Sequence, residues 1–328
     1  MTVDRRRFLS SAAAIAATTG LEAEWLRPKH HVFYRRPCSL VAVLNAAEYS
    51  EKTESLLFDG LRLFHLNVVG KVVLLKPNLV EDIPGPVNTH ATVVGAAARC
   101  FLRLGASRVV IGEGPAHQRD TELVVHAVGL KPHLSERQLE FIDLNRDELA
   151  RVKLKADFSG LGELWLPRTV LESDFVVSMP KVKTHHWAGV TLSLKNMFGI
   201  VPGMKYGWPK NLLHWHGIHE SILDICATVP VHFVIADGIT AMEGNGPLQG
   251  VARQLGKIVL ADDPIAADAT CARLMGFDPL RVRHLSDGGR FLGNLHTERI
   301  TMLAESVQPP TRPFTVLPEF EILRAPTT

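Results

Sequence analysis

The residues of this sequence that could carry chemistry are concentrated in one stretch, residues 175–219. This stretch holds five lysines and five histidines but no Asp or Glu. With 34 acids in a chain of 328 residues, a window of this length would be expected to hold about five. The lysines are interleaved with Gly, Thr, Asn and aromatic residues, which favours a pocket over a solvated charged surface. A stretch with many cations and no carboxylates therefore predicts a binding site for an anion.

The side chains predicted to bind this anion are lysines, helped by two amides. Lysine carries a compact charge that suits a carboxylate or a phosphate, although it is less selective in geometry than arginine. The predicted substrate-binding residues are Lys76, Asn78, Lys181, Lys183 and Asn196.

Two further residues of this stretch are the predicted catalytic groups, His185 and Lys195. His185 directly follows an expected strand end, and an imidazole has an ordinary pKa near neutrality. It is therefore the candidate for general acid–base chemistry. Lys195 lies with Asn196 in an expected helix over residues 191–200.

An acidic segment follows the basic one. Asp237, Glu243 and Asp262 are predicted to hold a divalent metal such as Mg²⁺ opposite the lysines, because hard cations prefer oxygen ligands. Alternatively, these carboxylates form salt bridges with those lysines. Asp263 precedes Pro264 and is expected to be a helix N-cap instead.

A second set of potential metal ligands lies on the helix expected over residues 211–229. His216, His219 and Glu220 share one face by their i, i+3, i+4 spacing. This face does not have the H-E-x-x-H pattern of zinc enzymes, and histidines beside a tryptophan are more often packed residues than ligands.

The elements that must position these residues alternate between strands and helices. Buried strands over residues 71–75 and 108–111 are each followed by an amphipathic helix, which predicts βαβ units, a mostly parallel sheet and an α/β fold. Ligands of such sheets bind outside the carboxyl ends of the strands. Lys76-Pro77-Asn78 and Gly112-Glu113-Gly114 fall at such ends. No G-x-G-x-x-G or Walker A motif is present.

Further strands are expected over residues 164–166, 175–179, 231–236 and 257–261. A glycine-rich loop is expected over residues 242–247, MEGNGP.

The amino terminus predicts export. Arg5-Arg6-Arg7-Phe8-Leu9 is followed by a short stretch of mostly small residues, which is typical of a Tat signal. We expect a signal over residues 1–23, a linker over 24–38, an α/β domain over 39–307 and a proline-rich tail over 308–328. An alternative is that this domain divides into two sub-lobes, residues 39–150 and 151–307. The expected location is periplasmic or extracytoplasmic, and an uncleaved membrane anchor is an alternative.

Cysteines and charge limit the classes of partner. The four cysteines are far apart and form no C-x-x-C motif, so no intrinsic iron–sulfur cluster is expected, and the pairing of any disulfide stays open. A net charge of +2 does not suggest a nucleic-acid partner.

Several long motifs carry a family resemblance. The sequences PKVKTH (180–185), GVTLSLKNMFGIVPG (189–203), ADGITAMEGNGPLQG (236–250) and ADDPIAADATCARLMGFDP (261–279) resemble the family of domain of unknown function 362. The resemblance extends over about residues 40–305. Many members of that family carry a ferredoxin-type iron–sulfur segment, whose cysteines this chain lacks.

Two functions follow as hypotheses. The first is an exported enzyme that acts on a small anionic substrate, carboxylate or phosphate, with a divalent metal as an alternative cofactor. The second is a non-catalytic binding or maturation protein that holds an anionic ligand or cofactor for an iron–sulfur redox partner. In both, the partners are a small anion and the Tat export machinery.

Overall fold

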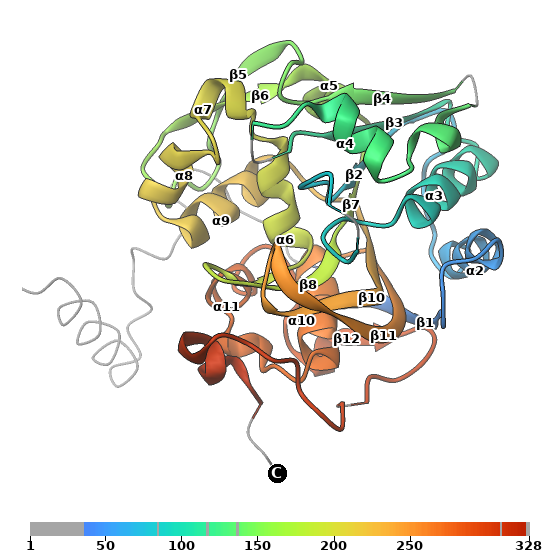
Figure 1. Cartoon of the computed structure of the whole chain (residues 1–328), viewed down its shortest axis with the longest axis vertical. Helices are drawn as coiled ribbons and strands as arrows, with labels where there is room; N and C mark the ends of the chain where they lie inside the picture. Colours follow the sequence, from blue (N-terminus) through green and yellow to red (C-terminus); the bar gives the residue numbers. More distant parts are fainter. Residues whose placement is uncertain (1–35, 84, 116–117, 136–137, 309, 326–328) are drawn as a thin grey trace, which may run out of the picture.

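A computed structural model describes residues 36–83, 85–115, 118–135, 138–308 and 310–325, and most of its strands form one large sheet (Figure 1). The strands are, in sheet order, β12 (Ile300–Met302), β1 (Ser39–Asn45), β11 (Gln249–Ala261), β10 (Phe233–Asn245), β7 (Phe175–Met179), β2 (Val72–Pro77), β3 (Arg108–Glu113) and β4 (Leu139–Asp143).

Parallel pairing dominates this sheet. The run β10–β7–β2–β3–β4 is parallel throughout, whereas β11 is antiparallel to both of its neighbours. Two short strands leave the main order: β8 (Lys181–His185) pairs with β10, and β9 (Gly189–Thr191) pairs with β8. The predicted α/β fold with a mostly parallel sheet is confirmed.

Helices cover both faces of the sheet (Figure 1). Successive side chains of a strand point to opposite faces, so each buried strand feeds two cores. In β2, for example, Val73 and Leu75 pack in one core and Leu74 packs in the other. The first core also contains α2 (Lys52–Leu61), α3 (Ala91–Arg103) and α4 (Thr121–Ala127). The second contains α9 (Ile218–Thr228), α10 (Pro264–Leu274) and α11 (Arg283–Gly288).

The remaining elements are short. A separate two-stranded antiparallel sheet joins β5 (Leu149–Lys153) and β6 (Glu163–Pro167). The short helices are α5 (Arg168–Glu172), α6 (Ser193–Asn196), α7 (Gly203–Tyr206) and α8 (Asn211–Trp215). The 3₁₀ turns are η2 (Lys131–Leu134), η3 (Met197–Ile200), η4 (Pro279–Arg281), η5 (Thr297–Arg299) and η6 (Pro318–Leu323).

The predicted sub-lobes, residues 39–150 and 151–307, both contribute strands to the same large sheet. The proline-rich tail packs onto the domain. Phe314 is fully buried, and the Thr315 backbone N–H donates a hydrogen bond to Glu243.

Three local predictions were wrong in detail. The helix expected over residues 191–200 is a strand end, one turn of α-helix (α6) and a 3₁₀ turn (η3). The helix expected over 211–229 is broken into α8 and α9 at Gly217, whose φ of 97° is left-handed. Most of the loop expected over 242–247 is strand, because residues 242–245 pair with 249–252 in the β10–β11 hairpin.

The Asp263 N-cap is confirmed. Its carboxylate accepts hydrogen bonds from the backbone N–H groups of Ile265 and Ala266 at the start of α10. All four cysteines are free thiols. The predicted export signal and most of the predicted linker lie outside the described residues. No helix of the described ranges is long and apolar enough to span a membrane.

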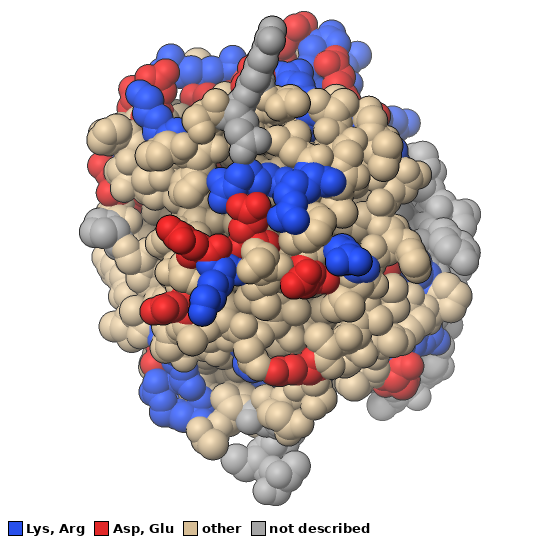
Figure 2. All heavy atoms as spheres, turned by 90° about the vertical axis from the view of Figure 1, so that its right-hand side faces the viewer, with Lys and Arg blue, Asp and Glu red and all other residues tan. Residues whose placement is uncertain are grey.

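Charged side chains on the face shown in Figure 2 are mixed in sign. Basic (blue) and acidic (red) groups lie next to one another there, with uncharged surface around them. Most lysines of the acid-free stretch are buried instead: Lys181, Lys183 and Lys210 are at most 1% exposed. Their burial raises the question of what balances their charge.

Candidate functional site

A cavity of about 800 Å³, which includes its open mouth, lies beyond the carboxyl ends of β2 and β3. The acid-free stretch contributes most of its wall, and the turn between β10 and β11 closes one side. The lining residues that matter below are Asn78, Glu113, Lys183, His185, His186, Thr191, Lys195, Asn196, Phe198, Lys210 and His214. Among the described lining residues, Glu113 is the only acid. The predicted position at the strand ends therefore holds for this cavity.

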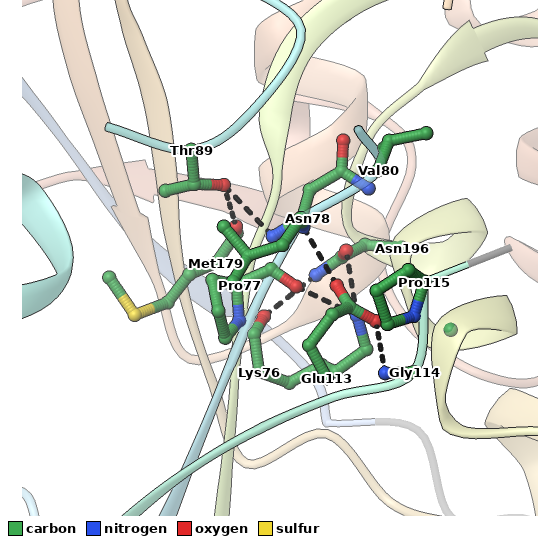
Figure 3. Close-up of polar contacts among 12 residues, drawn as sticks. Lys76, Pro77, Asn78, Val80, Thr89, Glu113, Gly114, Pro115, Met179 and Asn196 are labelled. Atoms are coloured by element: carbon green, nitrogen blue, oxygen red, sulfur yellow. Dashed lines mark hydrogen bonds and ion pairs between the residues drawn. The ribbon is translucent and has the colours of Figure 1, made fainter. Parts of the chain in front are cut away.

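The wall behind the cavity is a closed polar network around Lys76 (Figure 3). The Lys76 ammonium donates to Glu113 Oε2 at 2.7 Å, to the Pro77 carbonyl at 2.7 Å and to Asn196 Oδ1 at 3.2 Å. Asn196 Nδ2 in turn donates to the Lys76 carbonyl. All three donors of Lys76 are used, so this lysine holds the strand ends together and does not offer a hydrogen bond to a ligand.

Glu113 is also saturated by its surroundings. Besides the ion pair with Lys76, its carboxylate accepts hydrogen bonds from the backbone N–H groups of Leu79 and Gly114. A β-carbon at Gly199 would lie 2.4 Å from Glu113 Oε1, so this close approach requires glycine. Glu113 therefore neutralises Lys76 and leaves no countercharge for the other lysines of the cavity.

Two more lysines are held by backbone carbonyls. Lys210 donates to the carbonyls of Gly114, Phe198 and Gly199 at 3.1 to 3.2 Å, which uses all three of its donors. Burial lowers its pKa to about 7. Lys183 donates to the Val87 carbonyl at 2.6 Å and to the Pro247 carbonyl at 3.5 Å, so its ammonium form has one donor left for a ligand. Burial holds the pKa of Lys183 well below its ordinary value, and a bound anion would favour the charged form.

Lys195 differs from all of these. Within the part of the chain that the structure describes, its ammonium has no hydrogen-bond acceptor and no ion pair, and it lies 4.2 Å from the centre of the Phe198 ring. Burial and, secondarily, the charge of Lys76 lower its pKa to about 8, against the weaker opposing effect of Glu113. Lys195 is thus the cationic group that the cavity leaves available.

The short helix α6 that carries Lys195 is fixed by a carboxylate distant in sequence. Asp268 of α10 is fully buried and accepts hydrogen bonds from the backbone N–H groups of Ser193 at 2.6 Å and Leu194 at 2.9 Å. Burial raises the pKa of Asp268 to about 8, although these two bonds act in the opposite direction. The first turn of α6 is satisfied by this side chain instead of by a local cap.

His185 has a defined tautomer. Its Nδ1 accepts hydrogen bonds from the backbone N–H groups of Trp187 and Ala188 at 3.0 and 3.2 Å, so the neutral ring carries its proton on Nε2. Burial and the nearby Lys195 hold the pKa of His185 well below its ordinary value. The ring therefore offers a neutral N–H donor at Nε2. Its role in acid–base chemistry stays a prediction.

His214 has the opposite tautomer. Its Nδ1 lies 3.1 Å from the Lys210 carbonyl and must donate to it, which leaves Nε2 as an unprotonated acceptor. Burial and the charge of Lys195 lower its pKa to about 4. The cavity therefore holds one imidazole that donates from Nε2 and one that accepts there.

Two of the residues that line the cavity have a side-chain oxygen without a partner among the described residues. These atoms are Asn78 Oδ1 and Thr191 Oγ1, both shielded from solvent. Buried polar atoms usually find a hydrogen bond, so such atoms beside an open cavity are consistent with a ligand that completes them.

The other predicted residues lie elsewhere. Lys181 is buried away from the cavity lining, and its ammonium is 2.7 Å from Asp237 Oδ2 and 2.7 Å from the Tyr49 hydroxyl. Glu243 is paired with Arg253 and Arg312, and Asp262 is paired with Arg36.

Each of the three predicted metal carboxylates therefore has its own cation, as the salt-bridge alternative expected, although only Asp237 pairs with a lysine of the stretch. No group of three or more His, Cys, Asp or Glu within the described ranges is arranged to hold a metal ion. On the other predicted face, His219 contacts His284 through their Nδ1 atoms, and Glu220 is paired with Arg283.

Five of the predicted site residues come together at the cavity: Asn78, Lys183, His185, Lys195 and Asn196. Sequence reasoning did not assign Lys210, His214 or Thr191 to the site, although all three lie in or beside the acid-free stretch that signalled it. Glu113 was recognised only as a strand-end residue. Asp268 gave no signal, because it lies 75 residues after Ser193 in the chain.

Two known proteins are similar to part of this chain. The Thylakoid-associated protein sll1697 of Synechocystis sp. is 28% identical to this chain, and the match covers 65% of each. The matched part is thus just under two thirds of that relative's length. A Thermotoga maritima protein with a crystal structure from the Northeast Structural Genomics Consortium is 16% identical, with a TM-score of 0.35 over 62% of this chain and 53% of its own.

A family profile matches the central region of the chain. The profile described as "Domain of unknown function (DUF362)" matches residues 73–273, which include every residue that lines the cavity. The match covers more than half of the chain. The resemblance read from the sequence motifs is confirmed, and this chain belongs to the DUF362 family.

Proposed function

We propose that the cavity binds a small carboxylate anion and that the protein is an enzyme acting on it. The observation that supports this most is the Lys195 ammonium, which lies in the cavity lining with no acceptor among the described residues, while Glu113 is occupied by Lys76. Lys195 is partly buried, and a partly desolvated cation without a partner carries a free-energy cost that an anionic ligand would reduce.

The number of available donors favours a carboxylate over a phosphate. Lys195, one N–H of Lys183 and the Nε2–H of His185 can point to a ligand, whereas the donors of Lys76 and Lys210 are used. Three donors suit the two oxygens of a carboxylate. A phosphate dianion has three strong acceptor oxygens and usually recruits more donors or an arginine.

The test is calorimetric titration of the full chain with acetate, lactate, pyruvate and inorganic phosphate at low salt. Lys195→Gln is expected to weaken carboxylate binding about ten- to hundredfold, as the loss of one charged hydrogen bond would do. Lys205→Gln is the matched control, because Lys205 is an exposed lysine of the same stretch that does not line the cavity. Equal affinity in both variants would show that Lys195 does not bind the anion.

A further inference from the structure

The free state of Lys195 has a chemical consequence beyond charge. An amine is a nucleophile only when its lone pair is released, which requires a lowered pKa and no carboxylate holding the proton in place. Lys76 fails this condition because it is bound to Glu113, and Lys210 fails it because three carbonyls hold its ammonium. Lys195 meets it, since its Nζ has no hydrogen-bond or ion-pair partner among the described residues, lies over the Phe198 ring and has a pKa of about 8.

The two imidazoles of His185 and His214, which line the same cavity, have opposite tautomers, and carbonyl chemistry can use both. His185 presents Nε2–H, because two backbone N–H groups occupy its Nδ1. His214 presents a bare Nε2, because its Nδ1–H is bound to the Lys210 carbonyl. One ring can therefore polarise a carbonyl oxygen by donating to it, and the other can take a proton from nitrogen and pass it on.

We propose that Lys195 forms an imine with the carbonyl carbon of a small 2-oxo carboxylate bound in this cavity. This inference rests on the proposed function, because the same cavity must first bind the carboxylate. The charged Lys195 attracts the carboxylate on binding. Once Lys195 has lost its proton, the donor of Lys183 that no backbone carbonyl uses would hold the carboxylate, and His185 Nε2–H would donate to the keto oxygen.

The step balances without an oxidant or a reductant. The Lys195 ammonium loses one proton to water, and the neutral amine forms a bond to the keto carbon. His214 Nε2 passes a second proton from the nitrogen to the former keto oxygen, and a proton returned by water lets this oxygen leave as a water molecule. The nitrogen keeps one hydrogen and the positive charge, so the product is a protonated imine. Asn78 Oδ1, unpaired within the described structure, offers an acceptor for the hydroxyl of the intermediate.

The test is reductive trapping on the full chain. The protein is incubated with pyruvate and sodium cyanoborohydride, and the modified lysine is located by peptide mass mapping. We expect saturable modification of Lys195 in the parent protein and no modification of the corresponding peptide in the Lys195→Arg variant. Lactate, which has no keto group, should protect Lys195 from modification. Modification confined to other lysines such as Lys205, or to none, would overturn the proposal.

Calorimetry separates this proposal from the one on which it rests. If pyruvate and lactate bind but Lys195 is not trapped, the imine is wrong and the anion site stands. If neither binds, both proposals are wrong. His214→Gln is expected to slow trapping about a hundredfold while lactate affinity changes little, because the imidazole acts on the proton transfers and not on the carboxylate. An unchanged trapping rate in that variant would contradict the part assigned to His214.

Discussion

At the scale of single residues, the lysines of this protein differ in the groups that their ammonium ions contact, not in their charge. Lys76 and Lys210 have every donor bound to the protein, and Lys181 is paired with Asp237. Lys195 alone among the described lysines of the cavity wall lacks such partners. We therefore expect that substituting a lysine with bound donors lowers the stability of the fold, whereas substituting Lys195 lowers the affinity for the anion.

Lys210→Met and Lys195→Met should have different effects on the free energy of unfolding. The first leaves three buried carbonyls without their donor and should lower that free energy by about 3 kcal/mol or more. The second removes a cation that has no acceptor among the described residues, and should leave the free energy of unfolding within about 1 kcal/mol of the parent value, or higher. Denaturant unfolding measures both. A loss in Lys195→Met as large as in Lys210→Met would mean that Lys195 has a structural partner.

Carboxylate affinity should depend on pH through Lys195. Its pKa of about 8 means that the ammonium is charged at neutral pH and loses its proton as the pH rises through about 8. Affinity should then fall, by about tenfold per pH unit, until the raised pKa of the bound state is reached. Calorimetry between pH 7 and about 10 measures this. Lys195→Arg, which stays charged, should show a much flatter profile, and a parent profile as flat as that of the variant would exclude Lys195 as the titrating group.

At the scale of elements, the site depends on how short segments are fixed to the sheet. The turn α6 has four residues and cannot be stable alone. Asp268 of α10 holds its first N–H groups, and Asn196 ties its end to β2. The position of Lys195 is thus set by two contacts from distant parts of the chain.

Asp268→Ala should therefore reduce both stability and binding. Two buried N–H groups lose their acceptor, which should lower the free energy of unfolding by about 2 kcal/mol or more, and the loosened α6 should weaken carboxylate binding. Asp263→Ala is the control, since it removes a comparable buried cap from α10 whose partners do not line the cavity. We expect it to lower stability with little change in affinity. Equal affinity losses in the two variants would contradict a specific role for Asp268.

At the scale of the whole molecule, one large sheet places its parallel strand ends under a wall built from the acid-free stretch (Figure 1). The family match covers residues 73–273, so β1, β12 and the tail lie outside it. They extend and cover the sheet on the side of β11, as the bonds from Arg312 and Thr315 to Glu243 illustrate. The cavity itself needs none of them as lining.

Export through a membrane would act on the chain as a whole. The sequence around Arg5 and Arg6, which lies outside the described residues, predicts passage through the Tat pathway. Replacing both residues by lysine should abolish export of a fused reporter that functions only outside the cytoplasm, because the pathway requires the arginine pair. A reporter with a Sec signal serves as the control. Export of the double variant at the parent level would contradict the prediction.

The sequence by itself determined the fold class and identified several of the residues that line the cavity. Periodicity and buried strands follow from local pattern, and a stretch without acids is visible without any structure. The motifs that carry the family resemblance are likewise contiguous in the chain. The βαβ pattern predicted that Asn78 and Glu113 lie at strand ends, because the carboxyl ends of parallel strands meet at one edge of the sheet.

Only the tertiary structure decided which of the cations is free. Whether a lysine meets a carboxylate, a set of carbonyls or an open cavity depends on contacts between residues far apart in the chain, such as Lys76 with Glu113 and Lys181 with Asp237. The tautomers of His185 and His214 depend in the same way on which backbone groups their rings meet. Composition therefore pointed to the stretch that lines the cavity, and the fold leaves Lys195 as the cation there that has no partner among the described residues.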